Sequence, residues 1–206
     1  MSAKTYRVNE IFYSLQGEGF WTGTPMVFVR LSGCNLRCSF CDTSHEDGVL
    51  LSAGAILEKV RTLGGPCRRI CLTGGEPLLQ ADKELLDAFH QAGYSVHVET
   101  NGTCEVPVGI DWITLSPKED VPQLQGKGKV VLEKADELKL VFDGSLPQER
   151  LHFWAAFPAT WHFLQPCDTG NAQANASLTA QCIACIREAG APWRLSLQTH
   201  KLLNIR

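Results

Sequence analysis

The chain has 206 residues, of which 44% are hydrophobic and 20% are charged, and its formal net charge is −3. This composition is typical of a globular protein and excludes a largely disordered chain. The sequence has no basic stripe and no apolar run of membrane-spanning length, which disfavours nucleic-acid binding and a membrane protein. Because the N-terminus also lacks the apolar core of a signal peptide, we expect a cytoplasmic protein.

Apolar and amphipathic segments alternate along the chain. Strands are expected at 26–32, 69–73, 95–99, 111–116, 137–142, 160–165 and 193–198, and helices at 52–63, 82–92, 146–156 and 174–189. Ser52 and Asp82 are suitable N-caps for the first two helices, and Gly190 suits the end of the last. The alternation is typical of parallel βαβ units in one α/β domain covering residues 1–206. Polar motifs follow these strands, at the edge where such folds bind ligands.

Three of the nine cysteines fall within the segment CNLRCSFC, which follows the first expected strand. Cys34, Cys38 and Cys41 have the spacing C-x3-C-x2-C. A structural zinc ion needs four ligands, and His45 is a nearby candidate for the fourth. An iron–sulfur cluster is the alternative that we favour. Three cysteines on a four-iron cluster leave one iron free to bind a small molecule.

The cysteine loop, with Phe40 before its last cysteine and GGEP at 74–77, resembles the radical S-adenosylmethionine (SAM) superfamily. The resemblance implies that the three cysteines bind a [4Fe–4S] cluster and that SAM chelates the free iron. One electron from the cluster would then cleave SAM to a 5′-deoxyadenosyl radical. Positions that resemble SAM contacts are Phe40, Cys41, Asp42, Gly74, Gly75, Glu76, Ser116 and Lys118. We expect Glu76 to accept a hydrogen bond from the SAM ammonium. For Lys118, the alternative to a SAM contact is an ordinary solvent-exposed charge.

Further segments extend the resemblance over residues 9–206. They are LQGEG (15–19), Arg30, CDT (41–43), ETNG (99–102), SPK (116–118), LQP (164–166) and the C-terminal WRLSLQTHKLLNIR. Together they resemble the 7-carboxy-7-deazaguanine synthase family of 7-deazapurine and queuosine biosynthesis. The resemblance implies conversion of 6-carboxy-5,6,7,8-tetrahydropterin to 7-carboxy-7-deazaguanine, with ring contraction and loss of ammonia. It also implies a shortened, incomplete (β/α) barrel of the radical SAM type, with a mostly parallel sheet.

The same resemblance implies sites for a metal ion and for the substrate. Thr43 is expected to bind Mg²⁺ through its hydroxyl oxygen, with turn capping as the alternative. Substrate contacts are expected at Leu15, Gln16, Gly17, Arg30, Thr73, Glu99, Gln165 and His200. Arg30 suits the substrate carboxylate because a guanidinium binds a carboxylate bidentately, and its alternative is a salt bridge with Glu18. A purely structural role is the alternative for His200.

The family resemblance further implies a reduced flavodoxin or ferredoxin as the electron donor and a homodimer. Cys182 and Cys185 form a C-x2-C pair, with Cys167 upstream, but one shared helix face favours buried cysteines over a second cluster. Two other functions stay open. One is a radical SAM activase that installs a glycyl radical on a partner protein, and the other is a zinc-stabilised binding module without catalysis.

Overall fold

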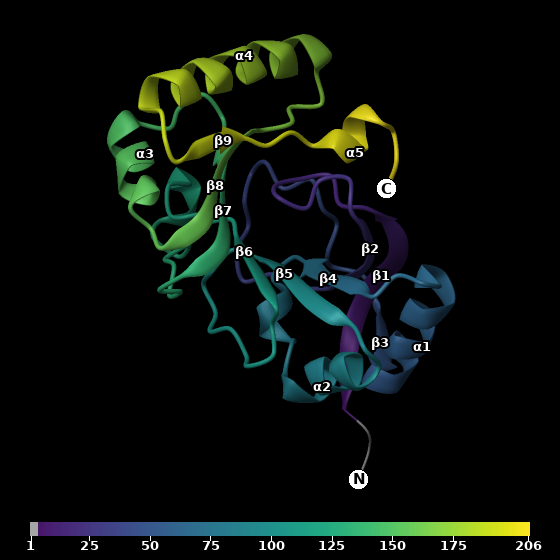
Figure 1. Cartoon of the computed structure of the whole chain (residues 1–206). Helices are drawn as coiled ribbons and strands as arrows, with labels where there is room; N and C mark the ends of the chain where they lie inside the picture. Colours follow the sequence, from purple (N-terminus) through teal and green to yellow (C-terminus); the bar gives the residue numbers. More distant parts are fainter. Residues whose placement is uncertain (1–3) are drawn as a thin grey trace.

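The computed structural model describes residues 4–206 as a nine-stranded sheet flanked by helices (Figure 1). The strands are β1 Thr5–Leu15, β2 Pro25–Leu31, β3 Val49–Ser52, β4 Arg69–Gly74, β5 Ser95–Thr100, β6 Trp112–Leu115, β7 Ala135–Phe142, β8 Ala159–Pro166 and β9 Trp193–Leu195. The helices are α1 Ala53–Gly64, α2 Lys83–Gln91, α3 Gln148–Ala155, α4 Ala172–Ala189 and α5 Thr199–Leu202, with 3-10 turns η1 Pro77–Leu79 and η2 Pro122–Leu124. Every strand and helix expected from the sequence is present, although β9 is shorter than predicted.

The strands follow the order β3-β1-β2-β4-β5-β6-β7-β8-β9, so the sheet begins and ends at free edges. From β2 to β9 all neighbouring strands run parallel, whereas β1 runs antiparallel to both β2 and β3. The predicted incomplete barrel with a mostly parallel sheet is therefore confirmed. Because parallel strands end at one edge, the polar motifs that follow them meet there.

The sequence analysis does not predict β1, β3 or α5. The buried residues Tyr6 and Val8 alternate as in a half-buried strand, but the register shifts between Val8 and Glu10. Such an irregularity breaks the period of two that marks a strand in a sequence. The expected alternation with helices is also incomplete, because no α-helix lies between β5 and β6 or between β6 and β7.

Two hydrophobic clusters hold the helices against the sheet (Figure 1). In one cluster Ile56 of α1 and Leu85 and Phe89 of α2 are fully buried against the first strands. Trp154 of α3 and Cys182 of α4 occupy the other cluster, against the last strands. Ser52 and Asp82 cap α1 and α2 as predicted. Among the described residues, no helix is long and apolar enough to cross a membrane.

Aromatic side chains fill the end of the half-barrel at which the parallel strands begin. Phe20 stacks on Trp112 and Trp161, with ring centroids 5.2 and 4.9 Å away. Trp21 packs edge-on against His97, 5.0 Å between centroids. These five residues form an aromatic plug at the N-terminal ends of β5, β6 and β8. The opposite end of the strands is left for a binding site.

Candidate active site

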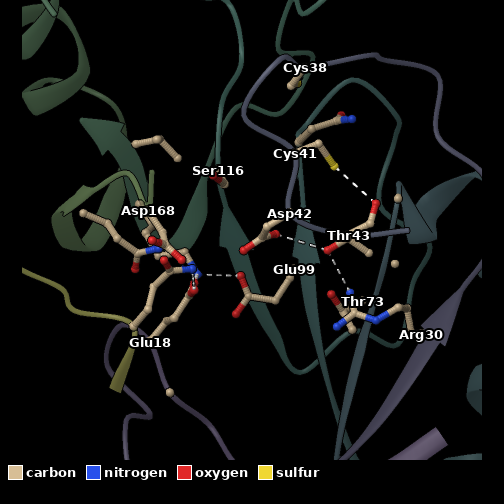
Figure 2. Close-up of a pocket in the computed structure, with 18 of the residues that line it drawn as sticks. Glu18, Arg30, Cys38, Cys41, Asp42, Thr43, Thr73, Glu99, Ser116 and Asp168 are labelled. Carbon is tan, nitrogen blue, oxygen red and sulfur yellow. Dashed lines mark hydrogen bonds and ion pairs between the residues drawn. The ribbon is translucent and has the colours of Figure 1, made fainter. Parts of the chain in front are cut away.

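A cavity of about 450 Å³ lies where the parallel strands terminate (Figure 2). It is lined by the last residues of the strands, by the loops that follow them and by the C-terminal segment. This volume is in the range of sites for small molecules. Every site residue predicted from the sequence lines this cavity except Glu76.

The cysteine loop follows β2 and places three free thiols on the cavity wall. Burial raises the pKa of the Cys34 and Cys38 thiols, and the positive charge of Lys118 opposes the rise. The backbone N–H of Leu36 donates a hydrogen bond to the Cys34 sulfur over 3.4 Å. Backbone donors and nearby cations of this kind stabilise thiolates that bind iron.

The arrangement of these thiols fits an iron–sulfur cluster better than a single ion. Within residues 4–206, no three His, Cys, Asp or Glu side chains converge closely enough to share one ion. Zinc would require thiolates at ~2.3 Å from one centre. A cluster instead gives each cysteine an iron of its own. Three free thiols around one cavity therefore provide the donor set for three of four irons, and His45 lines the same cavity.

The GGEP turn packs directly against the cysteine loop. A Cβ on Gly75 would lie 2.3 Å from the Gly33 carbonyl oxygen and 2.6 Å from the Cys34 Cβ, so only glycine permits this approach. The backbone N–H of Glu76 donates to the same Gly33 oxygen over 2.9 Å. The position of Cys34 therefore depends on the turn.

The side chain of Glu76 is fully buried and does not line the cavity, in contrast to the predicted contact with SAM. Its Oε1 accepts from the Leu78 N–H over 3.0 Å and from the Thr100 hydroxyl over 2.8 Å. Its Oε2 accepts from the Asn101 N–H over 2.7 Å. Glu76 also caps η1, which Pro77 begins. The carboxylate thus ties the turn to the end of β5.

Replacing Glu76 with alanine is expected to lower the free energy of unfolding by about 2–4 kcal/mol, because its buried donors lose their acceptor. Urea denaturation of the cluster-free protein measures the loss. Glu105→Ala removes an exposed carboxylate and is the matched control, with an expected change below about 0.5 kcal/mol. Unchanged stability together with weakened SAM binding would contradict the structural role and favour the contact with SAM.

Arg30 and Thr43 lie together on one wall of the cavity (Figure 2). The Arg30 Nε donates to Glu10 over 2.9 Å, and its Nη1 donates to the Thr43 hydroxyl over 3.3 Å. The alternative prediction of a salt bridge between Arg30 and Glu18 is wrong, because Arg30 pairs with Glu10 instead. The Thr43 hydroxyl in turn donates to Asp42 over 3.3 Å. This wall therefore presents a cation beside a hydroxyl oxygen.

The cavity floor carries the opposite charge. Glu18 and Glu99 both line the cavity, and Lys139 of β7 lies between them as their shared ion-pair partner. Burial would raise the pKa of Glu18, but Lys139 and its hydrogen bonds lower it to about 2. At Glu99, burial outweighs the effect of Lys139, and its pKa is raised. The site thus has a cationic wall and an acidic floor.

Comparison with known proteins relates this site to a family. The model of the radical SAM superfamily matches residues 28–123. A 7-carboxy-7-deazaguanine synthase from Bacteroides thetaiotaomicron is 46% identical over 200 residues, which cover 97% of this chain and 98% of that protein. The synthase from Burkholderia multivorans is 40% identical over 223 residues, which cover 98% and 99%. The chain belongs to the 7-carboxy-7-deazaguanine synthase family.

The crystal structure of QueE from Escherichia coli supports the same family, with a TM-score of 0.72 and 31% identity over 94% of this chain and 93% of that chain. As a family member, this chain is a radical SAM lyase, and its cofactors are a [4Fe–4S] cluster and SAM. The cysteine loop and the GGEP turn lie within the matched residues 28–123.

In this synthase-family chain the C-terminal segment 196–206 crosses the open side of the sheet, from β9 towards β1 and β2 (Figure 1). The Thr199 N–H donates to the Gly17 carbonyl oxygen over 2.9 Å. His200 lies so close that a Cβ on Gly17 would be 2.0 Å from its Nδ1. The C-terminal segment therefore brings together Gly17 and His200, which are both predicted substrate contacts.

Lys201 joins two further loops across the mouth of the cavity. Its Nζ donates to Asp42 over 2.7 Å and to Asp168 over 2.8 Å. The hydrogen bond from Lys201 holds the pKa of Asp168 well below its usual range. Because Asp42 adjoins Cys41 and Thr43, this ion pair fixes the end of the cysteine loop against the end of β8.

Sequence reasoning missed Lys139 and Lys201 and considered Glu18 only as a partner of Arg30. Lys139 interrupts the apolar segment ELKLVF, and a charge inside a buried strand is itself a signal that a partner lies nearby. The expected structural role of the later cysteines fits the geometry. Cys182 is fully buried and donates to the Leu164 carbonyl oxygen, and Cys185 packs against the same cluster.

Proposed function

We propose that this chain converts 6-carboxy-5,6,7,8-tetrahydropterin to 7-carboxy-7-deazaguanine with loss of ammonia, in 7-deazapurine and queuosine biosynthesis. The observation that carries the proposal is a cavity that joins a three-cysteine loop to a cationic wall and an acidic floor. The substrate has a carboxylate on one side and the N–H donors of an aminopyrimidinone ring on the other. Charge and hydrogen-bonding groups on the two sides therefore match. Relatives at 46% and 40% identity carry the name of this synthase.

The cofactor residues surround the upper part of the cavity. Cys34, Cys38 and Cys41 would hold the cluster, which when bound supplies the electron that cleaves SAM into the initiating radical. Residues proposed to contact SAM are Phe40, Cys41, Asp42, Gly74, Gly75, Ser116 and Lys118. The Lys118 ammonium donates to the carbonyl oxygen and hydroxyl of Ser116, both over 2.7 Å. This contact orients Lys118 along the cavity wall, which favours a ligand-binding role over a solvated charge.

The remaining residues bind and orient the pterin. Arg30 is proposed to pair with the substrate carboxylate, and Glu99 to accept from the pyrimidinone ring. Leu15, Gln16, Gly17, Thr73, Gln165 and His200 are the other proposed contacts. Gln165 is held by the Ser196 hydroxyl, which donates to its side-chain oxygen over 2.7 Å. Such fixed contacts lower the barrier by keeping the reacting carbon in one orientation.

We also propose that Mg²⁺ binds between Thr43 and substrate oxygens, since the hydroxyl lies on the cavity wall beside the Asp42 carboxylate. Thr43→Ala is expected to lower turnover by about 10–100-fold while iron content and SAM binding stay unchanged. Thr43→Ser keeps the hydroxyl and is expected to retain most activity. Activity titrated with Mg²⁺ measures the effect. Equal activity of the alanine and serine variants at limiting Mg²⁺ would contradict the assignment.

The function is tested with anaerobically reconstituted protein, SAM, a strong reductant, Mg²⁺ and the pterin. Synthesis from a free pterin, with about four irons per chain, separates this function from a glycyl-radical activase and from a zinc-stabilised module. The proposal includes a single domain of residues 1–206, a cytoplasmic location, reduced flavodoxin or ferredoxin as the donor, and a homodimer. The family resemblance supports these points, and turnover with reduced flavodoxin and the mass in solution test the last two.

A further inference from the structure

Lys139 is a buried cation with two carboxylate partners on the cavity floor. Its side chain is 5% exposed, and its Nζ lies 2.5 Å from Glu18 Oε2 and 2.9 Å from Glu99 Oε2. Both carboxylates line the cavity, and Figure 2 shows Glu99 between Glu18 on one side and Thr73 and Arg30 on the other. Burying a charged group costs free energy unless it is paired with an opposite charge. The burial of Lys139, Glu18 and Glu99 side by side therefore suggests a functional reason.

Lys139 is paired with two carboxylates and lies close to a third, that of Glu137. The titratable and charged groups that face Lys139 from the surrounding elements are Glu18, Glu99, Glu137, Lys118, His200 and Cys71. Burial raises the pKa of Glu137 to about 7, and this residue lies beneath the floor with its carboxylate accepting from the Phe20 N–H over 3.1 Å. Removal of Lys139 would therefore leave clustered carboxylates that compete for protons.

Each carboxylate that pairs with Lys139 is also oriented by an amide. Gln16 Nε2 donates to Glu99 Oε1 over 3.1 Å, and Gln198 Nε2 donates to Glu18 Oε1 over 2.9 Å. An ionised carboxylate has about four lone-pair directions, so each one keeps acceptor capacity after these contacts. A ring that presents neighbouring N–H donors, such as an aminopyrimidinone, is the chemical complement of such a floor.

We infer that Lys139 is a positioning residue for substrate recognition, which holds Glu18 and Glu99 as ionised acceptors so that Glu99 meets the N–H edge of the pterin ring. This inference rests on the proposed function, which supplies that ring. Lys139 acts through the carboxylates and needs no contact with the substrate. Loss of Lys139 therefore changes the protonation of Glu18 and Glu99 as well as the packing around them.

The test is binding of 6-carboxytetrahydropterin to the cluster-loaded protein with SAM and without reductant. Lys139→Met is expected to weaken binding about 30-fold at about pH 6.5 and less at about pH 8.5. The sign follows from Glu99, whose pKa is already raised by burial and rises further without the cation, so that low pH protonates the acceptor. Wild-type protein at the same two pH values is the reference, because any change in the protonation of the pterin itself affects the affinities of wild type and variant equally. The SAM affinity is expected to stay unchanged.

A second variant separates positioning from folding. Lys139→Met leaves two buried carboxylates without their cation and lowers the unfolding temperature. Adding Glu18→Gln removes one of these charges, so the double variant is expected to regain stability but to keep weak, pH-dependent pterin binding through Glu99. Glu18→Gln alone is the matched control.

The outcomes distinguish the two proposals. If wild-type protein binds the pterin and the double variant regains both stability and affinity, Lys139 is a structural cation and the inference is overturned. Equal affinity of wild type and Lys139→Met at both pH values overturns it as well. Failure of the wild-type protein to bind the pterin overturns the proposed function itself.

Discussion

Cys38→Ala is expected to abolish SAM cleavage and product formation, with a loss of at least about 1,000-fold, or ~4 kcal/mol in the activation barrier. The reason is that the thiol is one of three on the cavity wall, so its loss leaves the cluster with two protein ligands. Iron content after anaerobic reconstitution and the yield of 5′-deoxyadenosine measure the two consequences separately.

A cysteine outside the cavity provides the control for this loss. Cys185 packs against the hydrophobic cluster of α3 and α4 and does not line the cavity. Cys185→Ala is expected to retain about four irons and full turnover, with a stability loss of only about 1 kcal/mol. A Cys38→Ala protein that keeps wild-type iron content and SAM cleavage would show that the cluster lies elsewhere.

Arg30→Met is expected to lower kcat/KM for the pterin by about 100- to 1,000-fold, the second-largest effect. The substrate carboxylate would lose a charge-assisted, bidentate partner on the cavity wall. Steady-state rates at saturating SAM measure the loss, and its appearance mainly in KM would indicate a contact already formed in the ground state. Arg30→Lys keeps the charge but not the planar fork, so we expect partial recovery.

Arg30 also pairs with Glu10, so an indirect effect must be separated from a direct one. Tetrahydropterin without its carboxylate is the matched ligand. The variant and the wild type are expected to bind this ligand with similar affinity, because the contact that distinguishes them is absent. An equal loss for both ligands would show that Arg30 acts only through its ion pair with Glu10.

Much of the site could be predicted because its residues lie in short motifs that follow parallel strands. Fold geometry brings those strand ends to one edge, so motif position alone placed Thr73, Glu99 and Gln165 around one cavity. Glu76 is the exception, because a turn motif gives the position of a carboxylate but not its direction. In the structure the backbone N–H groups of Leu78 and Asn101 donate hydrogen bonds to the Glu76 carboxylate, which turns it away from the cavity.

Contacts between distant parts of the chain could not be predicted. Lys139 and Glu18 are 121 residues apart, and Lys201 and Asp42 are 159 apart, so no local pattern connects them. The contact between the C-terminal segment and the loop after β1 could not be predicted for the same reason, since Thr199 and Gly17 are 182 residues apart. Strand β1 was missed for a local reason, because the register shift before Glu10 ends its regular alternation.

The mass of the product from an anaerobic reaction is the most direct test of the assigned reaction. The reconstituted wild-type protein would be incubated with SAM, reductant, Mg²⁺ and uniformly carbon-labelled 6-carboxytetrahydropterin. Labelled 7-carboxy-7-deazaguanine with an equimolar amount of ammonia is the expected result. Formation of 5′-deoxyadenosine with the pterin recovered unchanged would contradict it, and would mean that this radical SAM enzyme acts on another substrate.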